Sequence, residues 1–277
     1  MIFSRSRART PDIELFINSV KIKREAETKF LGVIVDEALT WKKHIATVRT
    51  KMSRYLGVMY KLRCQLPLKA RLLIYHSFIQ SHLNYCCLIW GFAANSHIES
   101  LFRKQKAGMR AIMPGKVIYR YRNGEIPTHT KSSFCSYGIL AVQNIIVKNA
   151  LLLMHRIHFY KSSLPPSVSA LIPTSAPCPS DNRDHTLHKE WLDTYNTVVF
   201  RDSIFFKGPL LTMTTENEQL LGNKCNMTNL HKYKQSLRKL LVEMQRSGGS
   251  DEWPTFLLNN IKGLRQSNRQ KVLILIL

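Results

Sequence analysis

The chain has 277 residues and 44% apolar content, which is enough for one large domain or two small ones with hydrophobic cores. Its net charge of +23 favours a polyanionic partner, because self-repulsion destabilises a compact state; the candidates are nucleic acid and an anionic membrane surface. No stretch approaches the roughly 18 apolar residues that a membrane-spanning helix needs. Six cysteines without disulfide-framework spacing favour reduced thiols in an intracellular protein of the nucleus or the cytoplasm.

The basic charge is concentrated in the first part of the chain. Residues 1–161 carry 27 Lys and Arg against 8 Asp and Glu, whereas residues 162–277 carry 14 against 10. Between Ala38 and Ile98 there is no acidic residue at all. A basic run of this length without counter-charges predicts a polyanion-binding surface.

Two short β units are predicted at the N-terminus. Alternating apolar residues from Ile13 to Ile22, interrupted by Asn18 and Ser19, predict a β-hairpin with one buried face. Residues 30–35 predict a third strand, in which Gly32 marks a bulge or a close backbone approach.

Three amphipathic helices are predicted next, forming a bundle with a cationic outer surface. The first is capped by Thr40 and runs to about Arg63 with a single apolar stripe. The second covers residues 68–83. The third opens at Ser96, with Glu99 completing a capping box, and ends at residues 114–115.

The remainder of the chain is predicted to be largely helical. A buried helix is expected at residues 141–160, a Pro/Ser-rich linker at 164–199, and an amphipathic helix near 229–245. The expected fold class is therefore α+β, mostly α, with a small antiparallel β unit followed by helices. The expected segments are 1–37, 38–125, 126–163, 164–199 and 200–277.

The chain offers few groups for catalysis or metal binding. The adjacent acidic pairs, at residues 36–37 and 251–252, have no third carboxylate placed to complete a two-metal site, and Asp36 suits a turn or a helix cap. The histidine pairs His155/His158 and His185/His188 lack zinc-finger spacing. We therefore predict no catalytic residue and no metal ligand.

Aromatic residues accompany the basic helices. Their rings could stack on nucleic-acid bases, but aromatic residues at helical spacing are more often part of a core. The aromatic residues concerned are Trp41, Tyr55, Tyr60, Tyr75, Tyr85 and Trp90.

Three passages occur in an order that resembles a known family. They are KFLGVIVDEALTWKKHI, YKLRCQLPLKARLLIYHSFIQSHLNYCCLIWG and SLFRKQKAGMRAI. They are similar to passages that follow the palm and form the thumb in the reverse transcriptase of non-LTR (LINE-type, jockey-like) retrotransposons. SYGILAVQNIIVKNALLLMHRIHFYKSSLPPSV and FRDSIFFKGPLL resemble the post-polymerase region of the same elements, so the resemblance covers most of residues 1–245.

The resemblance implies roles for particular residues. Residues 1–37 correspond to a palm remnant in which Phe30, Leu31 and Gly32 match the primer grip, and residues 38–125 correspond to the thumb. The implied partners are RNA, DNA or an RNA–DNA hybrid rather than a membrane, together with the palm and fingers portion of the parent polyprotein. The implied phosphate contacts are Lys42, Lys43, Arg49, Lys51, Arg54, Lys61 and Arg63.

The sequence departs from the family at the catalytic centre. The family's F/Y-A-D-D hairpin and its upstream metal-binding aspartate have no counterpart here. We therefore expect a fragment of an RNA-directed DNA polymerase that is inactive alone and carries no cofactor, whereas the intact family enzyme uses Mg²⁺. A stand-alone basic helical module that binds RNA or DNA without a polymerase role is the alternative.

Overall fold

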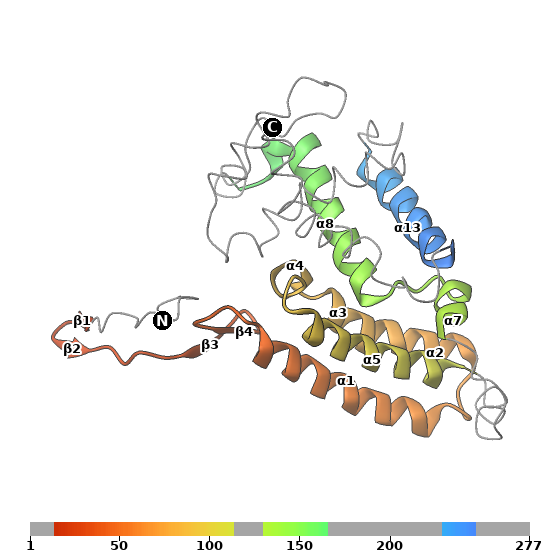
Figure 1. The fold of residues 1–277 in the computed structure, drawn as a ribbon, viewed down its shortest axis with the longest axis horizontal. Coiled ribbons are helices and arrows are strands. Elements are labelled where there is room, and N and C mark those ends of the chain that lie inside the picture. Colours follow the sequence, from red (N-terminus) through yellow and green to blue (C-terminus); the bar gives the residue numbers. More distant parts are fainter. Residues whose placement is uncertain (1–13, 114–129, 166–228, 248–277) are drawn as a thin grey trace, which may run out of the picture.

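A computed structural model describes residues 14–113, 130–165 and 229–247 (Figure 1). Two small hairpins precede a group of helices, which confirms the α+β, mostly α class. The expected linker lies almost wholly outside the described residues, as does most of 200–277. The elements are β1 (Phe16–Ile17), β2 (Val20–Lys21), β3 (Glu27–Phe30), β4 (Val33–Asp36), α1 (Lys42–Leu62), α2 (Leu68–Ile74), η1 (Tyr75–Gln80), α3 (Ser81–Asn84), α4 (Cys87–Trp90), α5 (Asn95–Ile112), α7 (Thr130–Ser136), α8 (Val142–Phe159), η2 (Lys161–Ser163) and α13 (Leu230–Ser247).

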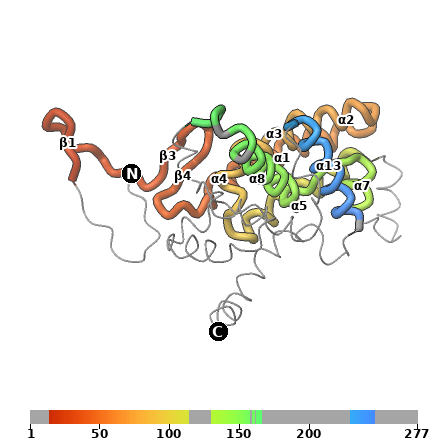
Figure 2. The backbone as a smooth tube through the Cα atoms, turned by 90° about the horizontal axis from the view of Figure 1, so that it is seen from above, coloured from red at the N-terminus to blue at the C-terminus, as the bar shows by residue number. Residues whose placement is uncertain are grey.

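The first hairpin has the predicted turn but not the predicted burial. Strands β1 and β2 are antiparallel, and Asn18 and Ser19 form the two-residue turn with φ of 47° and 65°. The expectation of one buried face is wrong, because the hairpin projects away from the helices (Figures 1 and 2). Its large apolar side chains are between 44% and 69% exposed: Leu15, Phe16, Ile17, Val20 and Ile22.

The predicted single strand at residues 30–35 is wrong. The chain reverses there, so that β3 pairs antiparallel with β4 and Phe30 lies opposite Val33. Leu31 and Gly32 are the two turn residues, with φ of 46° and 82°. Positive φ at both positions gives the twist that a two-residue hairpin requires, and glycine adopts it without strain. Gly32 is therefore a turn residue and not a bulge.

Asp36 links the second hairpin to α1. Its carboxylate accepts hydrogen bonds from the Thr40 N–H (2.9 Å), the Thr40 hydroxyl (2.9 Å) and the Trp41 N–H (3.0 Å). Burial raises the pKa of Asp36, but these hydrogen bonds outweigh burial and hold the pKa below its ordinary value. The expected cap, Thr40, lies one residue too early, because Trp41 occupies the cap position with φ of 62°. The expected turn or cap role of Asp36 is confirmed.

Replacing Asp36 with Ala is expected to lower the free energy of unfolding at pH 7 by about 1–2 kcal/mol, because three donors lose a charged acceptor. The pKa is lower in the folded state, so this stabilisation is present above the pKa of the unfolded chain. It is lost as the pH falls through the folded-state pKa. Urea unfolding at pH 7 and at pH 3 should therefore show the two proteins converging in acid. Glu37→Ala, which removes only an exposed ion pair with Arg24 (3.5 Å), should change the free energy by less than about 1 kcal/mol.

The three predicted basic helices are present, with different ends. The apolar stripe of α1 packs against α5, and the Tyr60 hydroxyl donates to the Ala107 carbonyl at 3.0 Å. The second helix runs from α2 through a π-helical turn, η1, into α3. The predicted capping box is wrong: α5 begins at Asn95, Ala94 takes the cap position, and Ser96 already lies within the helix, so no side chain caps its first turn.

One apolar cluster joins the described helices. It extends from Ile45 in α1 through α5 to Leu241 in α13. The predicted buried helix is α8, and the predicted amphipathic helix near 229–245 is α13. In Figure 1, α5 lies between α1 on one side and the α8–α13 pair on the other. The described parts of three expected segments therefore share a core, whereas their boundaries stay predictions.

Two buried glutamines hold the segment that leads into α8. Gln105 of α5 donates to the Leu140 carbonyl (2.9 Å) and accepts from the Val142 N–H (2.8 Å). Gln245 of α13 donates to the Ile139 carbonyl and accepts from the Ala141 N–H, each at 3.1 Å. Backbone groups that precede a helix have no intrahelical partner, so these side chains satisfy them and fix α8 to both neighbours.

Candidate nucleic-acid interface

The turn of the second hairpin is exposed and anchored. Phe30 and Leu31 are 67% and 74% exposed, and Gly32 lies beside them at the tip. The Tyr85 hydroxyl donates to the Leu31 carbonyl at 2.5 Å, and Trp90 Nε1 donates to the Tyr85 carbonyl at 2.9 Å. The structure thus brings the three expected primer-grip residues together on a tip that α3 and α4 hold in place.

Sequence reasoning missed the anchoring role of Tyr85. A Cβ atom on Gly32 would lie 3.6 Å from the Tyr85 ring, so the ring faces the side of Gly32 on which other residues carry a side chain. The available signal was the spacing of Tyr85, Trp90 and Gly91 in LNYCCLIWG. That motif follows the turn by more than fifty residues, and only the folded chain shows what the tyrosine contacts.

His44 fixes the hairpin to α1. Its Nδ1 accepts a hydrogen bond from the Ile34 N–H at 3.3 Å, and its ring lies 6.1 Å from that of Trp90. Burial, and secondarily the charge of Lys51, lower the pKa of His44. The neutral imidazole is therefore favoured, and it leaves Nδ1 free to accept. His44 therefore connects the hairpin that carries the exposed turn to the basic helix.

The seven expected phosphate contacts all lie on α1 or directly after it. Six are exposed, and Arg63 is half-buried with its guanidinium 5.8 Å from the centre of the Tyr60 ring. A helix turns about 100° per residue, so Lys43, Arg54 and Lys61 share one line along its outer side. Lys42 and Arg49 flank that line on one side, and Lys51 flanks it on the other. The structure places the set on one helix but spreads it over more than one face.

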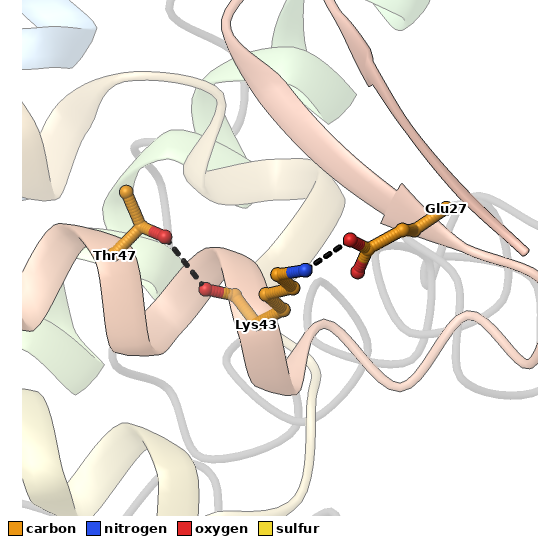
Figure 3. Close-up of polar contacts among 3 residues, drawn as sticks. All are labelled: Glu27, Lys43 and Thr47. Atoms are coloured by element: carbon orange, nitrogen blue, oxygen red, sulfur yellow. Dashed lines mark hydrogen bonds and ion pairs between the residues drawn. The ribbon is translucent and has the colours of Figure 1, made fainter.

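Lys43 has a partner within the protein. Its ammonium group forms an ion pair with Glu27 of β3, and the Thr47 hydroxyl donates to the Lys43 carbonyl at 2.9 Å (Figure 3). Both charged side chains are about half exposed. An exposed ion pair contributes less than about 1 kcal/mol, so a phosphate group can compete with Glu27 for Lys43.

The aromatic residues divide into core and surface groups. Tyr75 and Trp90 are fully buried, in agreement with a core role. Tyr55 stacks on two rings of the neighbouring helix, with centroid distances of 4.8 Å to Phe78 and 5.6 Å to His82. Phe78 is 43% exposed, and Lys51 contributes to lowering the pKa of His82 after burial. A partly exposed ring cluster therefore lies beside a cation of α1.

Within the described ranges, no three His, Cys, Asp or Glu side chains lie together as metal ligands would. None of the helices described there has the length and apolar character needed to cross a membrane.

The relatives of this chain define a class of protein. Three curated proteins match part of the sequence, and each is described as an RNA-directed DNA polymerase of a mobile element. No family model matches the chain. No solved structure matches it either.

The individual relatives are from fruit flies. The probable RNA-directed DNA polymerase from transposon X-element of Drosophila melanogaster is 33% identical over 109 residues, 38% of this chain and 12% of the relative. The polymerase from mobile element jockey is 28% identical over 113 residues in Drosophila funebris, 39% of this chain and 12% of the relative. The Drosophila melanogaster jockey polymerase is 28% identical over 127 residues, 44% and 14%. The similarity confirms the resemblance to reverse transcriptases of non-LTR retrotransposons, and the chain spans about an eighth of the length of these relatives.

Proposed function

We propose that this chain contributes primer and template binding to the reverse transcriptase of a non-LTR retrotransposon. The observation that carries the proposal is the connection between the exposed turn at residues 30–32 and the basic helix α1. Hydrogen bonds of Tyr85, His44 and Asp36 hold the hairpin with this turn against the helices. No acidic residue occurs between Ala38 and Ile98. The similarity to polymerases of mobile elements supplies the class of nucleic acid, RNA, DNA or their hybrid.

Helix α1 and the turn at residues 30–32 are proposed to contact different parts of the nucleic acid. The cations of α1 neutralise phosphate groups, which positions a duplex without selecting its sequence, as a polymerase requires. The turn presents backbone atoms to the 3′ end of a primer, and Gly32 takes the positive φ that this turn requires, with its missing Cβ facing the Tyr85 ring. Catalysis and Mg²⁺ binding are assigned to residues outside this chain, so the chain alone is proposed to be inactive as a polymerase.

Exchanging two outer cations of α1 tests the proposal. Arg54→Gln with Lys61→Gln should weaken binding of an RNA–DNA hybrid roughly tenfold at 100 mM salt. The slope of log affinity against log salt should fall by about two, because two phosphate contacts are lost. Fluorescence anisotropy with a labelled hybrid measures both quantities.

Lys21→Gln with Lys23→Gln removes the same charge from the first hairpin and is the matched control. Equal losses in the two double variants would mean that overall charge, and not α1, determines binding. If hybrid, duplex and single strand bind α1 equally and a turn variant, Leu31→Asp, has no effect, the stand-alone basic module is the better description.

A further inference from the structure

Helices α8 and α13 pack antiparallel, and a contact near each end of the pair fixes their register. At one end Asn144 Nδ2 donates to Gln245 Oε1 at 3.1 Å, and at the other the His155 and Tyr233 rings stack at 4.1 Å. Lys148 lies one turn after Asn144 and two turns before His155. The face of α8 that meets α13 therefore includes Lys148, a position where a lysine is unusual because burial disfavours its charge.

Two cations of α13 lie beside the contact between α8 and α13, which we call the seam. Lys234 and Arg238 are exposed, are one turn apart, and follow the buried residues Tyr233 and Leu237. Arg238 Nη2 donates to the Gly138 carbonyl at 3.3 Å, which holds the guanidinium near the start of α8. Burial, then Lys234 and then Arg238, lower the pKa of Lys148, whereas Cys87 acts in the opposite direction without outweighing them. The pKa of His76 in η1 is lowered as well, by burial and then by the charge of Arg238.

The described part of the chain supplies no counter-charge to this seam. The ion pairs seen there join residues of the two hairpins, the segments that follow them and the first turn of α1. Glu243 belongs to α13 but lies five residues beyond Arg238, so it projects from another side of the helix. Like charges held together in a partly desolvated place repel, and an anion bound between them relieves the repulsion.

We infer that Lys148, Lys234 and Arg238 form a second phosphate-binding site, which takes the backbone of a nucleic-acid segment other than the one along α1. Helix α1 and the α8–α13 pair lie on opposite sides of α5 (Figure 1), so the two groups of cations belong to different parts of the fold. The choice of nucleic acid as the source of the phosphate rests on the proposed function. The guanidinium contacts two phosphate oxygens in its plane, and the two ammonium groups act as point charges beside it.

Replacing Lys148 with Met in the full chain tests the site, because Met keeps the length of the side chain and removes its charge. For the unaltered chain, sodium phosphate is expected to raise Tm by a few degrees over sodium chloride of equal ionic strength. Lys148→Met should abolish most of this difference without lowering Tm in chloride. A single-stranded RNA oligonucleotide should bind the variant several-fold more weakly, with a salt slope smaller by about one.

Lys239→Met removes the same charge from α13 away from the seam and should keep both responses. Equal behaviour of the two variants, or the same Tm in phosphate and chloride for the unaltered chain, would overturn the site. If RNA binding depends on Arg54 and Lys61 but not on Lys148, this inference fails while the proposed function stands. If the phosphate effect depends on Lys148 but the chain binds no nucleic acid, the site stands and the proposed function fails.

Discussion

Replacing Gln105 with Ala is expected to lower the free energy of unfolding by about 3–5 kcal/mol, the range for breaking a buried hydrogen-bond network. The Gln105 side chain is fully buried and makes three hydrogen bonds. Two go to the backbone around the start of α8, and the third runs from Nε2 to the Tyr75 hydroxyl at 3.0 Å. Alanine leaves the Val142 N–H, the Leu140 carbonyl and the Tyr75 hydroxyl in an apolar core without this partner.

Tyr75→Phe is the matched comparison, since it removes one hydroxyl from the same network. Gln105 Nε2 keeps the Leu140 carbonyl, so we expect a loss of only about 1 kcal/mol. Urea unfolding followed by circular dichroism measures both variants. A cost below about 1 kcal/mol for Gln105→Ala would show that water or a shifted backbone satisfies the segment and that Gln105 does not fix α8.

The helices could be predicted from the sequence because their apolar residues recur with helical spacing. The hairpin tip was not predicted, because Leu31 and Gly32 continue an apolar run. Gly32 is a frequent turn residue, but within a strand pattern it also fits a bulge. Alternation in the first hairpin predicted strands correctly, but it does not show whether anything packs on them. The apolar pattern therefore predicted helix and strand, but neither the reversal of the chain at residues 31–32 nor the exposure of the first hairpin.

The candidate interface could likewise be predicted from the sequence only in part. The single apolar stripe predicted that the cations of α1 lie on its outer surface, and the lack of acidic residues among them predicted a polyanionic partner. The pairing of Lys43 with Glu27 depends on how the hairpin folds back, and the seam around Lys148 depends on a helix more than eighty residues further along the chain. Gln105 and Tyr85 stood within recognised motifs, yet their hydrogen bonds cross 30 to 54 residues of sequence.

Gly91 is a second position where one substitution has a large expected effect. Gly91 is buried directly after α4, where its N–H donates to the Cys87 carbonyl at 2.7 Å. A Cβ atom there would lie 2.2 Å from the Cys87 carbonyl oxygen and 2.8 Å from the side chain of Ile146 in α8. The carbonyl belongs to the backbone of α4, so the last turn of α4 has to distort, and the Ile146 side chain of α8 has to move as well. We expect Gly91→Ala to cost about 2–4 kcal/mol, more than usual overpacking because backbone must move.

Gly57→Ala provides the control of opposite sign. Gly57 lies within α1, is exposed, and has no atom within 4 Å of the position a Cβ would take. Alanine in an exposed helix interior stabilises by about 0.5–1 kcal/mol relative to glycine, so the Tm of this variant should rise. Thermal unfolding of both variants by calorimetry gives the comparison. A Gly91→Ala protein as stable as the unaltered chain would mean that the last turn of α4 and the Ile146 side chain of α8 do not surround Gly91 as described.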